Sequence, residues 1–495
     1  MNLNFGTVAG AAACALLLSI NAHGVPGEAG TIDATWGGAG QVKTPIGLNG
    51  NADPLVVGTA LQADRKLVVA ASCEGAESNA SLRNVCLVRY LPDGTLDASF
   101  GSGGILHQSW FASASDYAVA VLVQSDQKLI VVANCGSFCY ARLNSNGSFD
   151  TTYGTSGTGI ERPLNTSMTA THAEHHPDGR LSIVGHCTNG RMCAMRINSD
   201  GIIDGSFGTL GRAFHDITAG PDSAHHVVAE RDGAITMAGR CNGLACVVRL
   251  DGFGALDTSF SLTGYKLAAC GTTEFATKIR RQPDGKYLIG GAVNTAGVFS
   301  VCVTRLNADG TVDTGFASGG IYAANFSTNS STQFGDIHLQ PDGRIIVVGS
   351  CYGPTSVCAR RLNGDGSQDP SFANVNGGTL QFGGGATLHS FPTLLVPLPN
   401  GNFNLVNSCE ASAISFRQVC SFGFEGGAQA YRHCTLDLDG DGRVLPGTDA
   451  LMLTRIAAGF KGDKITNGVS FAAHATRTDA TSIHAYLVEQ CGFKL

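Results

Sequence analysis

Residues 302–320 read CVTRLNADGTVDTGFASGG, and residues 340–351 read QPDGRIIVVGSC. Each stretch joins a short apolar run to an Asp-Gly turn, whose residues accept the positive φ angles of tight β-turns. Apolar runs of this length between such turns are typical of antiparallel strands joined as hairpins. Both stretches recur along most of the chain, which makes internal repetition the first feature to resolve.

Seven copies of the second stretch follow one another along the chain: QADRKLVVAASC, QSDQKLIVVANC, HPDGRLSIVGHC, ERDGAITMAGRC, QPDGKYLIGGAV, QPDGRIIVVGSC and LPNGNFNLVNSC. Their turn residues are 52 to 62 residues apart, at Asp64, Asp126, Asp178, Asp232, Asp284, Asp342 and Asn400. A unit of this length suits a four-stranded sheet, and seven such sheets around an axis avoid long exposed edges. The sequence therefore predicts an all-β, seven-bladed β-propeller over residues 28–425.

The ends of this region indicate how the ring closes. Residues 31–42, TIDATWGGAGQV, carry half a repeat without the strands that should precede it, whereas the seventh unit ends at CSFGFEGG without that half. We expect one blade to be completed by both ends of the domain. A linear solenoid is the alternative, although it would more naturally carry whole, capped terminal repeats.

Composition excludes several classes of protein. The 495 residues include 66 glycines, are only 14% charged and carry a formal net charge of −7 without a run of Lys or Arg. This charge distribution predicts no positively charged surface that would bind nucleic acid or an anionic membrane. The apolar run VAGAAACALLLSI is too short to span a bilayer, and we interpret residues 1–24 as a secretory signal peptide, with a buried N-terminal strand as the alternative. No later run is long enough for a membrane helix, so we expect a secreted protein, extracellular or periplasmic.

The cysteines follow the repeat. Removing Cys14 with the signal peptide leaves 16 of the 17 cysteines, and six pairs each bracket the turn between two adjacent strands: Cys73 and Cys86, Cys135 and Cys139, Cys187 and Cys193, Cys241 and Cys246, Cys351 and Cys358, Cys409 and Cys420. Cross-strand Cα separations of about 4.5 to 5.5 Å suit a disulfide. Elimination then pairs Cys270 with Cys302, and Cys434 and Cys491 bracket the C-terminal segment. Zinc is the competing interpretation, but two thiolates per blade do not make a tetrahedral site.

The pattern RLNxDGxLDxSFGxxG followed by QPDGKIxVxG resembles the bacterial delta-60 repeat proteins over most of residues 30–425. The resemblance implies an extracellular β-propeller and says little about function, because the general function of that family is unassigned.

Residues present in every blade are most economically fold residues. We expect the recurring aspartates to cap turns and the recurring arginines to be structural as well. These are Asp97, Asp150, Asp204, Asp257, Asp313 and Asp369, with Arg89, Arg142, Arg196, Arg249 and Arg305.

Function on the propeller should lie where blades differ. The fourth and sixth residues before each turn residue point to the same side of the preceding strand. In blades 1, 2 and 7 they are apolar: Gly58, Ala60, Ala120, Leu122, Leu394 and Val396. In blades 3 to 6 all but Val228 are ionisable: His172, Glu174, His226, Lys278, Arg280, Asp336 and His338. If this strand is innermost, these seven side chains converge on the central channel as a candidate binding site; a solvated channel edge is the alternative.

The tail differs from the repeats. After a linker over residues 426–433, the segment 434–495 contains DLDGDGR, in which acidic side chains occupy calcium-loop positions one, three and five. We predict a calcium site formed by Asp437, Asp439, Asp441, the Arg443 carbonyl and Asp449, followed by a helix after Thr448; a solvated Asp-Gly turn is the alternative. The loop and helix resemble a dockerin calcium repeat. Dockerins carry two, and the second segment here, HATRTDATSIHAYLVEQ, lacks the loop ligands, which weakens the implied cohesin-like partner.

Enzyme motifs are scarce. The sequence has no GxSxG elbow, HExxH motif or P-loop. We therefore predict a secreted, non-enzymatic binding or scaffold protein with a protein or glycan ligand and a calcium-binding tail. The alternative is an extracellular carbohydrate-active enzyme with a dockerin-like attachment module, using Glu174 and Asp336 as an acid/base pair whose function depends on their separation.

Overall fold

The computed structural model describes residues 29–46, 55–74, 82–111, 115–163, 167–267, 274–295, 297–326, 332–340, 342–351, 356–373, 378–382, 394–398, 401–410, 417–426, 438, 446–457, 460–471 and 478–485. The predicted signal peptide lies outside these residues. Within them, no helix combines the length and apolar character needed to cross a membrane.

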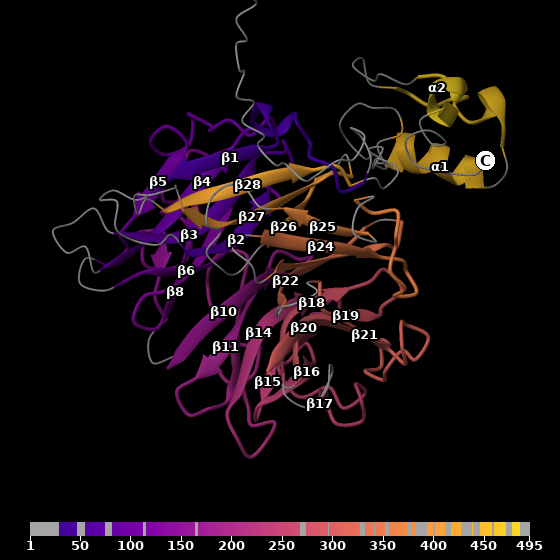
Figure 1. Ribbon diagram of the computed structural model, residues 1–495. Coiled ribbons are helices and arrows are strands. Elements are labelled where there is room, and N and C mark those ends of the chain that lie inside the picture. The colour runs from indigo at the N-terminus through magenta and orange to yellow at the C-terminus, as the bar shows by residue number, and fades with distance from the viewer. Residues whose placement is uncertain are drawn as a thin grey trace, which may run out of the picture.

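The chain forms seven four-stranded antiparallel sheets, as predicted (Figure 1). Blades 1 to 3 contain β2 (Leu55–Leu61), β3 (Leu67–Glu74), β4 (Arg83–Tyr90) and β5 (Ile105–Gln108); β6 (Tyr117–Val123), β7 (Leu129–Asn134), β8 (Phe138–Leu143) and β9 (Ile160–Glu161); and β10 (Met168–His175), β11 (Leu181–Cys187), β12 (Met192–Ile197) and β13 (Arg212–His215). Blades 4 to 6 contain β14 (Asp222–Ala229), β15 (Ile235–Cys241), β16 (Leu244–Leu250) and β17 (Tyr265–Leu267); β18 (Glu274–Arg281), β19 (Tyr287–Thr295), β20 (Val298–Leu306) and β21 (Ile321–Ala324); and β22 (Thr332–Leu339), β23 (Ile345–Cys351), β24 (Ser356–Leu362) and β25 (Thr379–Phe382).

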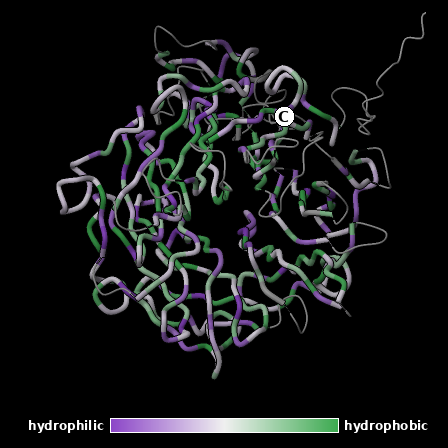
Figure 2. Tube along the Cα trace, turned by 60° about the vertical axis from the view of Figure 1, so that its left-hand side comes forward, coloured by the Kyte–Doolittle hydropathy of each residue, from purple (hydrophilic) through white to green (hydrophobic). Residues whose placement is uncertain are grey.

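Blade 7 closes the ring. It combines β26 (Leu394–Pro397), β27 (Phe403–Glu410) and β28 (Arg417–Phe424) with the N-terminal strand β1 (Gln41–Pro45), which pairs with β28 from Gln41 opposite Phe422 to Pro45 opposite Gln418. The first strands of successive units contact one another around a complete circle, and β26 contacts both β22 and β2. Figure 2 shows the chain arranged around the resulting central axis. The predicted closure by both ends of the domain is confirmed, and the solenoid alternative is wrong.

The core lies between the blades. One apolar cluster joins Ile130 and Val132 of blade 2 to Ile183 and Met195 of blade 3, and the clusters at the other blade boundaries are built in the same way. All eight residues of β3 are buried, because this strand is covered on both faces by its neighbours. A single blade would therefore leave two apolar faces exposed to water.

Six predicted disulfides are present, between Cys73 and Cys86, Cys135 and Cys139, Cys187 and Cys193, Cys241 and Cys246, Cys351 and Cys358, and Cys409 and Cys420. Their Cα separations of 5.8 to 6.1 Å exceed the directly opposed spacing that the sequence predicts. The bridges are diagonal: in blade 6 Cys351 lies opposite Ser356, while Cys358 lies opposite Gly349. Cys302 is disulfide-bonded, whereas Cys270, Cys434 and Cys491 lie outside the described residues.

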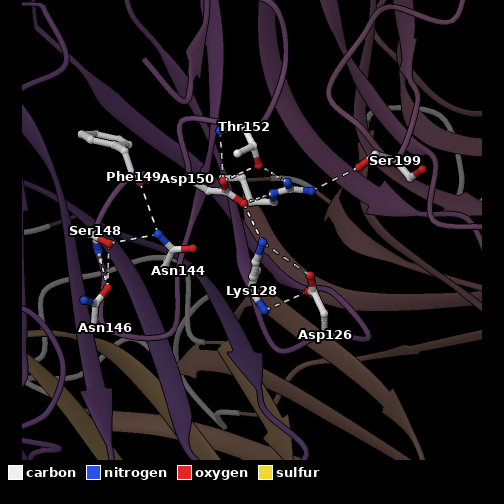
Figure 3. Close-up of polar contacts among 10 residues, drawn as sticks. Asp126, Lys128, Asn144, Asn146, Ser148, Phe149, Asp150, Thr152 and Ser199 are labelled. Carbon is white, nitrogen blue, oxygen red and sulfur yellow. Dashed lines mark hydrogen bonds and ion pairs between the residues drawn. The ribbon is translucent and has the colours of Figure 1, made fainter. Parts of the chain in front are cut away.

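An arginine–aspartate ion pair recurs in six blades, with both partners buried in blades 1, 3 and 6. The arginine near the end of each third strand places its Nε 2.7 to 3.0 Å from an aspartate eight residues later. The pairs are Arg89–Asp97, Arg142–Asp150, Arg196–Asp204, Arg249–Asp257, Arg305–Asp313 and Arg361–Asp369. The other carboxylate oxygen caps the turn as predicted; in blade 2, Asp150 accepts hydrogen bonds from the backbone and hydroxyl of Thr152 and also binds Lys128 (Figure 3).

The same arginines connect each blade to the next one. Arg89 lies 4.5 Å above the centre of the Phe100 ring and donates a hydrogen bond to the Ser145 carbonyl of blade 2. Blades 2, 3, 5 and 6 repeat both contacts. In addition, the residue after each of these aromatic side chains donates its backbone N–H to a carbonyl of the neighbouring blade. Gly101 of blade 1 donates to Asn146 of blade 2, and Gly37 of blade 7 donates to Asp93 of blade 1.

The tail contains short helical segments. These are η2 (Pro446–Ala450), α1 (Leu451–Ala457), η3 (Gly462–Lys464) and α2 (Ala480–Ala485), with an apolar cluster that includes Met452, Ile465 and Ile483. The predicted helix is present, but the helical conformation begins at Pro446, so Thr448 lies inside it and not before it. Proline is favoured at the first helical position because it has no N–H to satisfy, which explains the earlier start.

The ion pairs predict acid sensitivity. Burial alone would raise the pKa of Asp97, Asp204 and Asp369, but hydrogen bonds from neighbouring serines and the adjacent guanidinium groups outweigh it and lower each pKa to about 2. Because the folded pKa lies below the unfolded one, the stabilisation is complete above about pH 4 and is lost as the pH falls through about 2. We expect the melting temperature to drop by on the order of 10 °C between these limits. The variant Asp97→Asn should be less stable at neutral pH and lose less on acidification; an equal loss in variant and wild type would contradict this.

A leucine in the left-handed backbone region predicts a stabilising substitution. Leu210 has φ 54° and is 77% exposed, whereas Gly103 and Gly319 occupy the same position in blades 1 and 5 with φ 62° and 63°. Leu210→Gly should therefore raise the free energy of unfolding by about 1 kcal/mol in guanidinium titrations with the disulfides intact. Gly319→Leu is the matched control, since a Cβ there meets no atom within 4 Å, and it should lower stability by a similar amount. Changes of the same sign in both variants would refute the backbone explanation.

Candidate functional site

A cavity of about 440 Å³ lies at the centre of the ring and is lined by the first strands of all seven blades. These strands are therefore innermost, as the channel hypothesis requires. The lining contains all seven candidate residues: His172, Glu174, His226, Lys278, Arg280, Asp336 and His338. The apolar half is formed by residues that include Gly58, Ala120, Leu122, Leu394 and Val396, while Ala60, also expected, is not part of the lining.

A β-bulge in the innermost strand positions the lining side chains. In blades 1 to 6 the register shifts by one residue, as between Ala170 and His172, directly before the first of the two lining positions. A bulge re-aims the side chains that follow it. It also brings adjacent residues such as Val57 and Gly58 to the cavity, which strict alternation along a strand excludes and which the sequence interpretation missed.

Arg280 connects three neighbouring blades. Its Nη1 lies 2.9 Å from Nε2 of His226 in blade 4, and its Nη2 lies 3.0 Å from Oδ1 of Asp336 in blade 6. The Asp336 carboxylate also accepts hydrogen bonds from the backbone N–H groups of Ile337 and Leu395. Asp336 is 3% exposed, so its charge is neutralised and hydrogen-bonded inside the ring wall.

Two histidine rings stack beside this arginine. The centroids of His172 and His226 are 3.6 Å apart and their planes are inclined by 26°. Because a guanidinium can only donate, Nε2 of His226 accepts, which places the ring proton on Nδ1. Burial, reinforced by neighbouring positive charge, lowers the pKa of both rings well below the ordinary value. Both Nδ1 atoms lack a hydrogen-bond partner within the described parts of the chain.

Lys278 and Glu174 are the remaining charged candidates. Burial lowers the pKa of Lys278, with Asp336 opposing the shift, and burial raises the pKa of Glu174 to about 7, with Arg280 opposing. Across the described residues, neither side chain forms a hydrogen bond or an ion pair. Burial also lowers the pKa of His338 to about 4. At neutral pH the three histidines are therefore uncharged and Glu174 is partly protonated.

The arrangement limits what chemistry the cavity can support. Glu174 and Asp336 both line it, but Asp336 is held by Arg280 and two backbone amides, so of the two carboxyl groups only Glu174 is free to exchange a proton with a ligand. Among the described residues, the one group of three close metal-binding side chains is Cys73, Cys86 and His107, and its two cysteines are bonded to each other. The zinc interpretation of the paired cysteines is therefore wrong.

Of the predicted calcium ligands, the structure describes Asp449. Its side chain is 1% exposed and accepts a hydrogen bond from the backbone N–H of Leu438, which brings the two ends of the loop together. Asp437, Asp439, Asp441 and Arg443 lie outside the described residues.

One comparison with known proteins supports the propeller. The model of a β-propeller domain of unknown function (DUF5122) matches residues 62–100, 282–316 and 340–372. No curated protein matches the chain. Similar solved structures include a protein of unknown function from Bacteroides caccae (9% identity, 57% of this chain and 90% of that chain covered, TM-score 0.36), YCF48 from Cyanidioschyzon merolae (11%, 78% and 99%, 0.42) and the polysaccharide lyase Uly1 (8%, 78% and 98%, 0.44). The chain is thus similar, over three of its repeats, to a propeller family without an assigned function.

Proposed function

We propose that this protein is a secreted binding protein that holds a small ligand in the central cavity and performs no chemistry on it. The observation that carries the proposal is the difference between blades. Blades 3 to 6 place ionisable side chains on the innermost strand where blades 1, 2 and 7 place apolar ones. A cavity of about 440 Å³ with apolar walls and a few convergent polar groups has the size and character of a ligand site.

The way the two carboxyl groups are used supports binding without chemistry. Most glycoside hydrolases use two carboxyl groups that both act on the substrate. Asp336 is bonded to Arg280 and to a backbone amide of the ring wall. Glu174 therefore lacks a second carboxyl group in the described cavity lining with which to carry out that mechanism. This argues for binding over the carbohydrate-active alternative.

Secretion is supported by the disulfides. Six bridges in a single chain need an oxidising environment to form and persist. The apolar N-terminal run agrees with export.

A ligand screen tests the binding proposal. Melting temperatures would be measured for wild type and Leu122→Trp, which fills the cavity, against amino acids, carboxylates and neutral and acidic sugars. A ligand at a hundred times its Kd adds about 2.7 kcal/mol, a rise of a few degrees for a chain of this length. We expect such a rise for wild type and for Leu55→Trp, a control at a 45% exposed leucine, but not for Leu122→Trp. No response to any compound would refute the proposal, and conversion of the ligand, followed by mass spectrometry, would favour the enzyme.

For the tail we propose a single calcium ion bound by Asp437, Asp439, Asp441, the Arg443 carbonyl and Asp449. The buried Asp449 carboxylate, held against Leu438, fits the closing position of such a loop. The second segment of the tail lacks the loop ligands, so a cohesin-like partner is not proposed.

Metal removal tests the calcium site. With calcium, trypsin should cleave the tail at least tenfold more slowly than with a chelator, because the ion holds the loop and the following helix together. Magnesium should protect far less, since it demands a tighter octahedral shell. In the variant Asp437→Asn with Asp441→Asn, calcium should give no protection. Equal cleavage of the wild-type tail with calcium and with chelator would show that the loop is a solvated turn.

A further inference from the structure

We infer that the ligand of the central cavity is a small amphipathic carboxylate whose anionic group binds Lys278 and whose apolar part extends toward blades 1 and 2. This inference rests on the proposed binding function and specifies its ligand class.

Lys278 differs from the other basic side chains of the propeller. Elsewhere in the described propeller, basic side chains at recurring positions are paired: Lys66, Lys128, Arg180, Lys286 and Arg344 each contact an aspartate. Lys278 is half-buried in the cavity wall, yet it has no ion pair or hydrogen bond among the described residues. Burying an ammonium group without a partner costs free energy. A purely structural role would not offset that free-energy cost, whereas an incoming anion would supply the missing partner.

The cavity wall around Lys278 supplies little negative charge. Arg280 is neutralised by Asp336, and the low pKa values of His172, His226 and His338 leave these rings uncharged near pH 7. Glu174, with a pKa of about 7, carries at most part of a negative charge. Burial lowers the pKa of Lys278 and Asp336 opposes that shift. As an ammonium group Lys278 is not fully balanced by the cavity, and a single anionic group is its electrostatic complement.

The wall of the cavity opposite Lys278 is mostly apolar. In a ring of seven blades, the side facing blade 5 lies between blades 1 and 2, where the lining consists of residues such as Gly58, Ala120 and Leu122. Apart from the Thr59 hydroxyl, the side chains that line the cavity in blades 1 and 2 are apolar, so they leave room for the body of a ligand and offer it few hydrogen bonds. Bare phosphate would gain nothing from this wall, whereas a carboxylate with an alkyl or aryl body matches both sides.

The test uses straight-chain carboxylates from butanoate to octanoate, their primary amides and inorganic phosphate as probes. Binding would be measured by calorimetry on the full chain, for wild type and Lys278→Met. We expect at least one carboxylate to bind wild type 10- to 100-fold more tightly than its amide and than it binds Lys278→Met, as is usual for a charged hydrogen bond. Affinity should rise with chain length, and phosphate should bind weakly. Lys266→Met, the same change on the outermost strand β17, should leave binding unchanged.

Stability provides an independent readout that a structural role would not produce. Because Lys278 has no partner in the described structure, Lys278→Met should raise the melting temperature of the unliganded protein. Equal binding of amides and carboxylates, with no effect of Lys278→Met, would overturn the anion inference and leave the cavity a binding site. Phosphate binding as tight as that of the carboxylates would overturn the apolar part. Failure of every probe to bind, together with a lower melting temperature for Lys278→Met, would overturn the inference and assign the lysine to the fold.

Discussion

The recurring arginine–aspartate pair is the interaction on which the propeller depends. Burying two charges is costly unless every remaining donor and acceptor is satisfied. Here the carboxylate also accepts hydrogen bonds from a serine or threonine in most blades, and the guanidinium covers an aromatic ring and reaches a carbonyl of the next blade. Pairing within one blade is thereby coupled to contact with its neighbour. Since each blade needs a neighbour on both sides, β1 must return to blade 7 before the ring is complete.

This frame explains why the centre of the ring is free to vary. The ion pairs, their aromatic partners and the backbone bonds that follow these aromatic residues belong to the third strand and the turn after it. The innermost strand contributes backbone pairing, a bulge and one buried face, and most of the side chains that face the axis lie outside this frame. Ionisable residues can therefore replace apolar ones there, blade by blade, provided that a buried charge such as Asp336 finds a partner.

Much of this could be predicted from the sequence, because turn chemistry and repeat period are local signals. They predicted the blade number, the closure and the six described disulfides. Counting back from the turn also found the lining residues, since the same bulge precedes them in blades 1 to 6. Side-chain partners could not be predicted in this way. Arg280 reaches residues 54 and 56 positions away on two other blades, and the diagonal geometry of the disulfides depends on strand register rather than on spacing.

The two cations of β18 show why position alone does not identify function. Lys278 and Arg280 lie two residues apart, line the same cavity and are equivalent by any count along the strand. Arg280 holds His226 and Asp336, so its removal would leave a carboxylate buried and unpaired and would disturb the wall itself. Lys278 forms no hydrogen bond or ion pair with any residue that the structure describes. In a repeat protein every blade serves as a control for the others, and a charge that breaks the pattern without gaining a partner is explained better by a ligand than by the fold.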